Sequence, residues 1–255
     1  MIILNASILF LAAFLGGGSY LLLPQFRKIN FRNVLMFSGA YLFSITLVHL
    51  LPEVFSNFPN PAVIGIFVLA GFFLQLILEF LSEGIEHGHT HIHSGKHSPD
   101  QDRTHFHSTH ILSLMVGLGV HSFLEGMIVA HPSTPAFHHH SGTILLGIVL
   151  HKVPAAFALM TVMVFARIKK TNIWIYLAVF SLASPAGLAF SQYLNQEAGL
   201  TARHVSLLYG IVCGTFLFIS TTIFFETSPG HRFNFEKLLY ALAGGTLAVI
   251  SEIFI

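Results

Sequence analysis

The most regular feature of the chain is a series of long hydrophobic segments separated by short polar ones. A helix that spans a membrane needs about 20 mostly apolar residues. Eight segments meet this requirement, at residues 2–23, 34–55, 61–82, 111–130, 143–166, 172–193, 204–226 and 237–255. No stretch outside them could fold as a separate aqueous domain, so residues 1–255 are predicted to form a single membrane domain, an all-α bundle of eight transmembrane helices.

The basic residues predict how this bundle is oriented. Lys and Arg are enriched in cytoplasmic loops. Ten of the twelve basic residues lie in or beside the first, third, fifth and seventh loops: Arg27, Lys28, Arg32, Lys96, Arg103, Arg167, Lys169, Lys170, Arg232 and Lys237. We therefore expect these loops to face the cytoplasm and both termini to lie outside. No basic residue precedes the first apolar segment, which predicts a retained helix rather than a signal peptide.

The composition narrows the class of protein further. Hydrophobic residues make up 54% of the chain and charged residues only 9%, against about a quarter charged in soluble proteins. The net charge of +1 gives no reason to expect a nucleic-acid partner. Cys213 is the only cysteine, which excludes an internal disulfide or a thiolate cluster. Histidine, with 17 residues, outnumbers either class of charged residue and indicates a membrane protein that handles metal.

Two polar loops hold many of these histidines. Residues 83–110 are too polar to span or to pack, so we expect a disordered cytoplasmic loop. Its histidines and those of an outward-facing loop are compatible either with weak metal binding or with simple solvated segments. The residues concerned are His87, His89, His91, His93, His138, His139 and His140.

Ionisable residues also occur inside the hydrophobic segments, where they are costly and usually face the bundle interior. His121 and Glu125 in the fourth segment are four residues apart and so share one helix face. At 1.5 Å per residue they lie about 15 and 21 Å from the inner end of that helix. His151 of the fifth segment comes out at a similar depth, about 18 Å from the inner side. The three side chains are therefore predicted to meet near the membrane midplane.

Two further features lie close to this predicted site. His49 and Glu53 form another pair four residues apart in the second segment, placed by the same count toward the outside. Pro154 follows His151 and removes the hydrogen bond to the carbonyl of Leu150, which predicts a kink and unwound backbone beside the site.

Imidazole and carboxylate groups suit Zn²⁺, and also Fe²⁺, Mn²⁺, Co²⁺ or Cd²⁺. Metal transport is the function that fits best. No phosphate-binding motif is present, so the transport is expected to be downhill or coupled to an ion gradient. One alternative is an intramembrane zinc-dependent hydrolase with Glu53 as its base. Another is a haem bundle with axial histidines. A single intramembrane histidine also has a purely structural explanation, a hydrogen bond to a neighbouring helix.

Four short motifs resemble those of the ZIP family of divalent metal transporters. They are HSFLEG at 121–126, HKVPAAFAL at 151–159, HLLPE at 49–53 and GTFLFIS at 214–220. The resemblance implies a 3+2+3 arrangement of spans with an inverted repeat and movement of spans one, four, five and six against the others. It also implies a possible homodimer and zinc uptake into the cytoplasm without catalysis or a required cofactor. No organellar targeting signal is evident, so the expected location is the plasma membrane, or the inner membrane in a bacterium.

The resemblance also assigns individual residues. His121, Glu125 and His151 match the ligands of the family's central site, and His49 and Glu53 match positions on its outer side. Many members have a carboxylate directly after the histidine of the fifth span and an asparagine after that of the fourth. This chain has Lys152 and Ser122 at those two positions. An ammonium group repels a second cation and can pair with Glu125, so a single-metal site is predicted.

Overall fold

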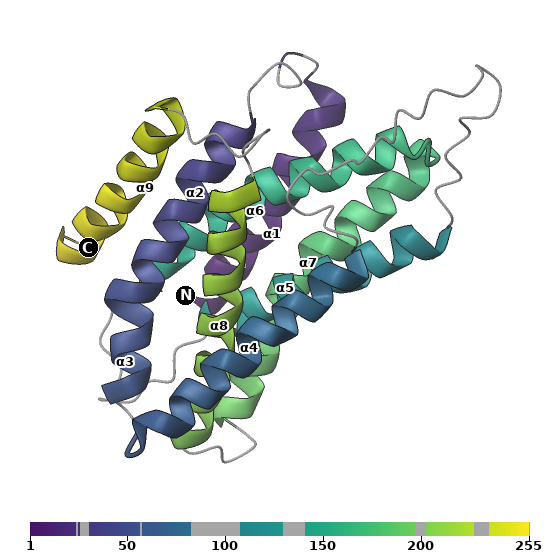
Figure 1. Cartoon of the computed structure of the whole chain (residues 1–255). Helices are drawn as coiled ribbons and strands as arrows, with labels where there is room; N and C mark the ends of the chain where they lie inside the picture. The colour runs from purple at the N-terminus through teal and green to yellow at the C-terminus, as the bar shows by residue number, and fades with distance from the viewer. Residues whose placement is uncertain are drawn as a thin grey trace.

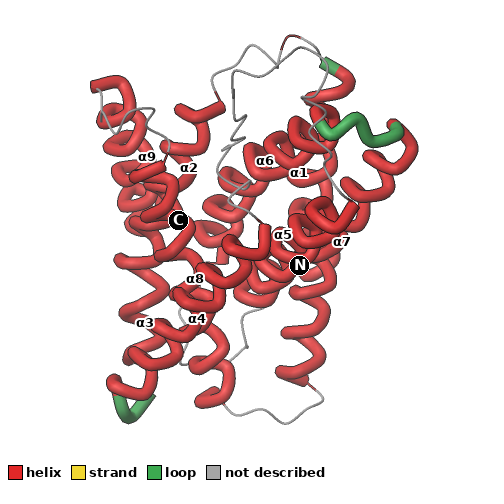
Figure 2. The backbone as a smooth tube through the Cα atoms, turned by 45° about the vertical axis from the view of Figure 1, so that its right-hand side comes forward, coloured by secondary structure: helices red, strands yellow, loops and turns green. Residues whose placement is uncertain are grey.

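The structure is a computed structural model of the chain, and it describes residues 1–23, 25, 31–56, 58–82, 108–129, 141–196, 202–226 and 235–254. Within these ranges the chain is a bundle of helices and contains no strand (Figures 1 and 2). The helices are α1 (Ile2–Leu22), α2 (Phe31–Ile45), η2 (Thr46–Leu50), α3 (Leu51–Ser56), α4 (Pro61–Ser82), α5 (Ser108–Val129), α6 (Ser141–Phe165), α7 (Lys170–Gln196), α8 (Ala202–Glu226) and α9 (Phe235–Phe254).

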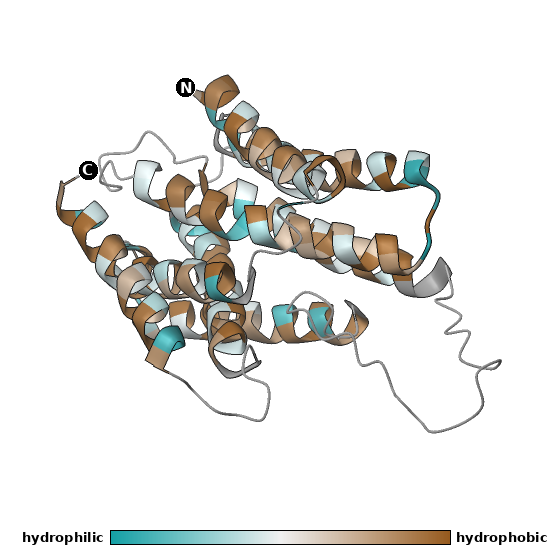
Figure 3. Ribbon diagram, turned by 90° about the horizontal axis from the view of Figure 1, so that it is seen from above, coloured by the Kyte–Doolittle hydropathy of each residue, from teal (hydrophilic) through white to brown (hydrophobic). Residues whose placement is uncertain are grey.

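Eight helical segments are long and apolar enough to cross a membrane, which confirms the predicted all-α class and number of spans. Hydrophobic residues cover most of the length of the helices (Figure 3), and many large apolar side chains point outward, such as Phe80 on α4 and Phe254 on α9. Apolar side chains on the outside of a bundle are what a lipid environment requires.

The second span is not a uniform α-helix. It runs through α2, η2 and α3, and η2 is a single π-helical turn in which the N–H of Leu51 reaches back to the carbonyl of Thr46. Pro52 follows this turn and has no N–H to offer the carbonyl of Val48, so the usual spacing of helical hydrogen bonds is interrupted here. Wide turns of this kind are common at functional sites, and this one contains His49.

The helices divide into two groups by their packing. The most extensive contacts join α1 to α6, α5 to α7, α4 to α8 and α2 to α9, and α1 also packs along α7. Helix α2 packs along α8, and to a similar extent along α6, as α4 does along α5, so the two groups are also in contact with each other. In Figure 1, α9 lies beside α2 at the left, while α5 and α7 lie together at the right. One group is therefore α1, α5, α6 and α7, and the other is α2–α3, α4, α8 and α9.

The same pairing has the form expected of an inverted repeat. Exchanging spans one, two and three with spans six, seven and eight, and span four with span five, turns the α1–α6 contact into the α7–α5 contact. It likewise turns α4–α8 into α9–α2, and both members of each exchange are among the most extensive contacts.

Glycines allow helices within these groups to touch backbone to backbone. A methyl group on Gly126 of α5 would overlap the carbonyl of Ser184 on α7, and one on Gly187 would overlap the carbonyl of Phe123. Gly71 of α4 and Gly214 of α8 have the same reciprocal relation to each other's helix. Such close seams between small residues are a common way for helices to pack in lipid.

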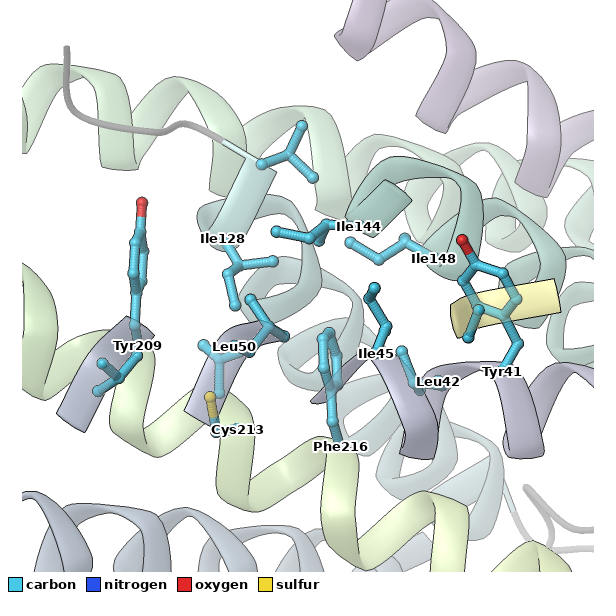
Figure 4. Packing of buried hydrophobic residues seen from close by; sticks show 14 of the residues in the cluster. Tyr41, Leu42, Ile45, Leu50, Ile128, Ile144, Ile148, Tyr209, Cys213 and Phe216 are labelled. Carbon is cyan, nitrogen blue, oxygen red and sulfur yellow. The ribbon is translucent and has the colours of Figure 1, made fainter. Parts of the chain in front are cut away.

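The described residues form three buried apolar clusters, and the two larger ones flank the predicted metal site. The first draws residues from all the helices and is centred on α2, η2, α5, α6 and α8, where Ile128, Ile144 and Ile148 face Leu50 and Phe216 (Figure 4). The second joins α1, α5, α6 and α7 and contains residues such as Leu118 of α5 and Ala156 of α6. Along both α5 and α6, the segments between these clusters contain the polar residues of the predicted metal site.

Candidate metal site

Helices α5 and α6 bring three ionisable side chains to one point. His121 Nε2 and Glu125 Oε1, one turn apart on α5, are 3.2 Å from each other. The ring of His151 on α6 meets the ring of His121 edge to face, with centroids 5.8 Å apart. One ligand atom from each of the three residues lies within 4.8 Å of the other two, and all three residues are buried.

This geometry can be compared with what a zinc ion requires. Nitrogen and oxygen ligands lie about 2.0–2.2 Å from zinc in a tetrahedral site, which puts neighbouring ligand atoms about 3.3 Å apart. His121 and Glu125 already have this spacing, and His151 needs a side-chain shift on the order of 1 Å to reach it. Three protein ligands leave the fourth position of a tetrahedral zinc ion for water. Structural zinc sites, by contrast, have four protein ligands and no open position.

Lys152 fills part of this site with its own positive charge. Its ammonium group donates a hydrogen bond to Glu125 Oε2 at 2.5 Å and another to Ser122 Oγ at 2.7 Å. Lys152 is only 1% exposed, so the ammonium group and the carboxylate compensate each other's burial. The expected pair between Lys152 and Glu125 is therefore present, and it leaves Oε1 as the carboxylate atom nearest to His121.

A chain of hydrogen bonds continues from this ammonium to α7. The hydroxyl of Ser184 donates to the carbonyl of Ser122 at 2.6 Å, and the two hydroxyl oxygens are 3.1 Å apart. Because the Ser184 proton is committed to that carbonyl, Ser122 must donate its own proton to Ser184 and accept from Lys152. Both serines are fully buried, so the direction of every hydrogen bond in the chain is fixed.

The close approach of α7 supports the turn that carries the ligands. Gly126 follows Glu125 directly, and its missing side chain makes room for the backbone of Ser184. The same α7 residue thus contacts α5 on both sides of Glu125, through Ser122 and through Gly126. We expect this double contact to hold the ligand-bearing turn in place.

The other predicted site residues lie apart from this cluster or outside the described residues. His49 and Glu53 form a separate group with Glu252 of α9. Pro154 lies within α6, which remains a continuous α-helix from Ser141 to Phe165, so the unwound backbone expected there is not found. The predicted loop histidines His87, His89, His91, His93, His138, His139 and His140 fall outside the described residues.

Comparison with known proteins identifies the family. The model of the ZIP zinc transporter family matches residues 81–252, a segment that contains His121, Glu125 and His151. The chain belongs to the ZIP zinc transporter family. Family membership and the eight helices that are long and apolar enough to cross a membrane together show an integral membrane protein.

Individual ZIP relatives match at moderate identity. Zinc transporter ZIP9 of Micropogonias undulatus is 29% identical over 167 residues, covering 63% of this chain and 50% of that protein. Zinc transporter ZIP1 of Danio rerio is 26% identical over 267 residues, covering 86% of this chain and 84% of that protein. The chain thus spans about half the length of the ZIP9 relative and most of the ZIP1 relative.

Membership of the ZIP family confirms the resemblance seen in the sequence. The family consists of zinc transporters, in agreement with the expectation that the chain is not an enzyme, and nothing in the comparisons supports the hydrolase alternative. The sequence did not predict two contacts of the predicted site residues: the hydrogen bond of Ser184 to Ser122, and the contact of Glu252 with His49. The one available signal for Ser184 was a small polar residue in an apolar span, next to Pro185 and near Gly187.

Proposed function

We propose that this protein transports divalent metal ions, above all zinc, across a membrane through one site formed by His121, Glu125 and His151. The observation that carries the proposal is the convergence of these three buried ligand groups from two helices. Their chemistry fits zinc and also Fe²⁺, Mn²⁺ or Cd²⁺. The names of the ZIP1 and ZIP9 relatives support zinc as the substrate.

The site takes one ion at a time because Lys152 occupies the place of a second. Its ammonium group touches Glu125, and a second cation there would lie against a fixed positive charge. Substitution of Lys152 by glutamate removes that charge and adds a ligand. Equilibrium binding to Lys152→Glu should therefore show one more zinc ion per chain than the wild type. An unchanged count would contradict the single-ion assignment.

Transport requires the apolar packing on both sides of the site to open in turn. Ile128 and Ile144 belong to the cluster on one side, and Leu118 and Ala156 to the cluster on the other. A hydrated ion cannot cross such packing without rearrangement. Alternating access between two bundles with a midplane site is the general solution for transporters with inverted repeats. Uptake into the cytoplasm is the direction that we propose, with His49 and Glu53 on the outer approach and the His-rich loop at 83–110 receiving the ion inside.

Zinc flux into liposomes tests this function. Purified protein should carry Zn²⁺ or Cd²⁺ into liposomes, and His121→Ala or Glu125→Ala should abolish the flux. His204→Ala, an exposed histidine at the start of α8, is the matched control and should leave it intact. Thermal unfolding of each variant shows whether it is folded. Flux that persists in both folded site variants would refute the assignment, and competition among Zn²⁺, Fe²⁺, Mn²⁺ and Cd²⁺ would rank the substrates.

A further inference from the structure

The ammonium group of Lys152 is held by more than its ion pair with Glu125. It also donates a hydrogen bond to Ser122 Oγ at 2.7 Å, and it lies over the ring of Phe180, 5.5 Å from the ring centroid. A cation within about 6 Å of a ring centroid is attracted by the negative face of the ring, most strongly where water is excluded. Phe180 is 2% exposed and Lys152 is 1% exposed, so water is excluded from this contact.

Two side chains of α7 stand behind these contacts, and they lie on one face of that helix. Phe180 and Ser184 are four residues apart, on the helix that packs closely along α5 (Figure 1). Phe180 touches the ammonium group directly. Ser184 acts through Ser122, because it donates to the Ser122 carbonyl and accepts the Ser122 hydroxyl proton. The lone pairs of Ser122 Oγ are therefore left for the ammonium group of Lys152.

The Glu125 carboxylate has one oxygen for each of two cations. Its Oε2 touches the ammonium group, and its Oε1 lies 3.2 Å from His121 Nε2, where a metal ion would bind. An ion bound to Oε1 repels the ammonium group at the other oxygen. Ser122 and Phe180 still hold that group when Glu125 is shared, because neither contact requires a carboxylate. An ammonium group held by Glu125 alone would instead become a buried and uncompensated charge, which is costly.

We propose that Phe180 and Ser184 are positioning residues that hold the Lys152 ammonium group, and that they keep it in the site when a divalent ion binds Glu125. The ion rests on the proposed function, whereas the hold of α7 on the ammonium group does not. Helix α7 thereby determines how strongly the ammonium group competes with the ion, although it contributes none of the three candidate ligands.

Thermal unfolding of the purified full chain in the presence of a chelator tests the hold on the ammonium group. Phe180→Leu is made in the wild type and in Lys152→Leu, which has no ammonium group. The loss of the attraction between ring and cation should lower the unfolding temperature by about 1–8 °C more in the wild type than in Lys152→Leu. Phe157→Leu is the matched control, because the Phe157 ring belongs to the same apolar cluster and meets the ring of Tyr20. Its effect should be the same with and without Lys152.

Zinc binding, measured by competition with a chelating dye, tests the second part of the proposal. Each variant is compared with its own His121→Ala counterpart, so zinc bound elsewhere on the chain cancels. Ser184→Ala and Phe180→Leu should each raise the dissociation constant about 3–30-fold, and neither should raise it in the Lys152→Leu background. Ser181→Ala is the matched control, because Ser181 is a fully buried α7 serine whose hydroxyl donates to a carbonyl of its own helix. It should leave the dissociation constant unchanged.

Three results would overturn the proposal. The first is an effect of Phe180→Leu on the unfolding temperature that is the same with and without Lys152. The second is unchanged zinc affinity in folded Ser184→Ala and Phe180→Leu. The third is a loss of zinc affinity that persists in Lys152→Leu, because the substitutions would then act on the fold and not through the ammonium group. Failure of zinc flux in liposomes counts against the proposed function and leaves the unfolding result standing, so the two failures are distinguishable.

Discussion

The ion pair of Lys152 with Glu125 predicts that two different cations, the Lys152 ammonium group and a bound metal ion, can each compensate the buried Glu125 carboxylate. In the structure the two groups are 2.5 Å apart and almost fully buried. Removing one partner of a buried ion pair costs about 3–5 kcal/mol, because the other charge is left uncompensated. Lys152→Met replaces the methylene stem of lysine with an unbranched apolar chain of similar length, so the loss of the ammonium charge is the main change.

The expected effect on stability follows from this cost. Near the midpoint, 1 kcal/mol shifts the unfolding temperature of a chain of about this size by about 2–4 °C. Lys152→Met should therefore unfold about 6–20 °C below the wild type in the absence of metal. A zinc ion at Glu125 replaces the missing positive charge, so zinc should stabilise the variant more than the wild type. The gain in affinity can reach about two to four orders of magnitude, the same 3–5 kcal/mol expressed as binding.

Thermal unfolding in detergent, followed by circular dichroism with a chelator or with zinc, measures both effects. Lys170→Met is the control, since Lys170 is exposed at the start of α7 and should behave as wild type. The reasoning is refuted if Lys152→Met is as stable as the wild type without metal. It is equally refuted if zinc raises the unfolding temperature of both proteins by the same amount.

Three further predictions concern the same scaffold. Gly126→Ala would overlap the Ser184 carbonyl, so it should lower both stability and zinc affinity. Gly119→Ala is the control, because Gly119 lies on the same helix with open space around it; it should be neutral or stabilising by up to about 1 kcal/mol. Equal unfolding temperatures for Gly126→Ala and Gly119→Ala would contradict the close packing of α5 against α7. Tyr41→Phe loses hydrogen bonds to Ser251 Oγ and to a backbone carbonyl of α6 and should destabilise by about 1–3 kcal/mol in thermal unfolding; no change would show that these hydrogen bonds add nothing. Stabilisation by zinc should shrink from about pH 7.5 to about pH 5.5, because histidine ligands bind metal only when neutral, and pH-independent stabilisation would argue against imidazole ligands.

The number of spans and the grouping of His121, Glu125 and His151 could be predicted from the sequence because each depends on local spacing. Apolar length identifies a spanning helix, and the spacing of His121 and Glu125 places both on one helix face. The partner from the next helix, His151, followed from matching depths. These are properties of straight helices in a slab of fixed thickness, so little information from the fold is required.

Other features depend on how helices face each other, which spacing alone does not specify. The contact of Ser184 with Ser122 requires a particular rotation of α7 against α5, set by Gly126 and Gly187. Glu252 lies 203 residues from His49 in the chain, so only the packing of α9 against α2 brings them together. Pro154 gave a misleading signal, because α6 accommodates it within a continuous helix, while the irregular turn occurs before Pro52.

The lysine inside the binding site has an electrical consequence for a transporter. With neutral imidazoles, the ammonium and carboxylate of Lys152 and Glu125 sum to zero in the empty protein and to two positive charges once a divalent ion is bound. The membrane voltage then acts on the loaded step and not on the return of the empty carrier. At about 2.3 kcal/mol per charge per 100 mV, a negative interior would favour inward movement of each ion by about 4.6 kcal/mol per 100 mV, without a co-transported proton or ATP.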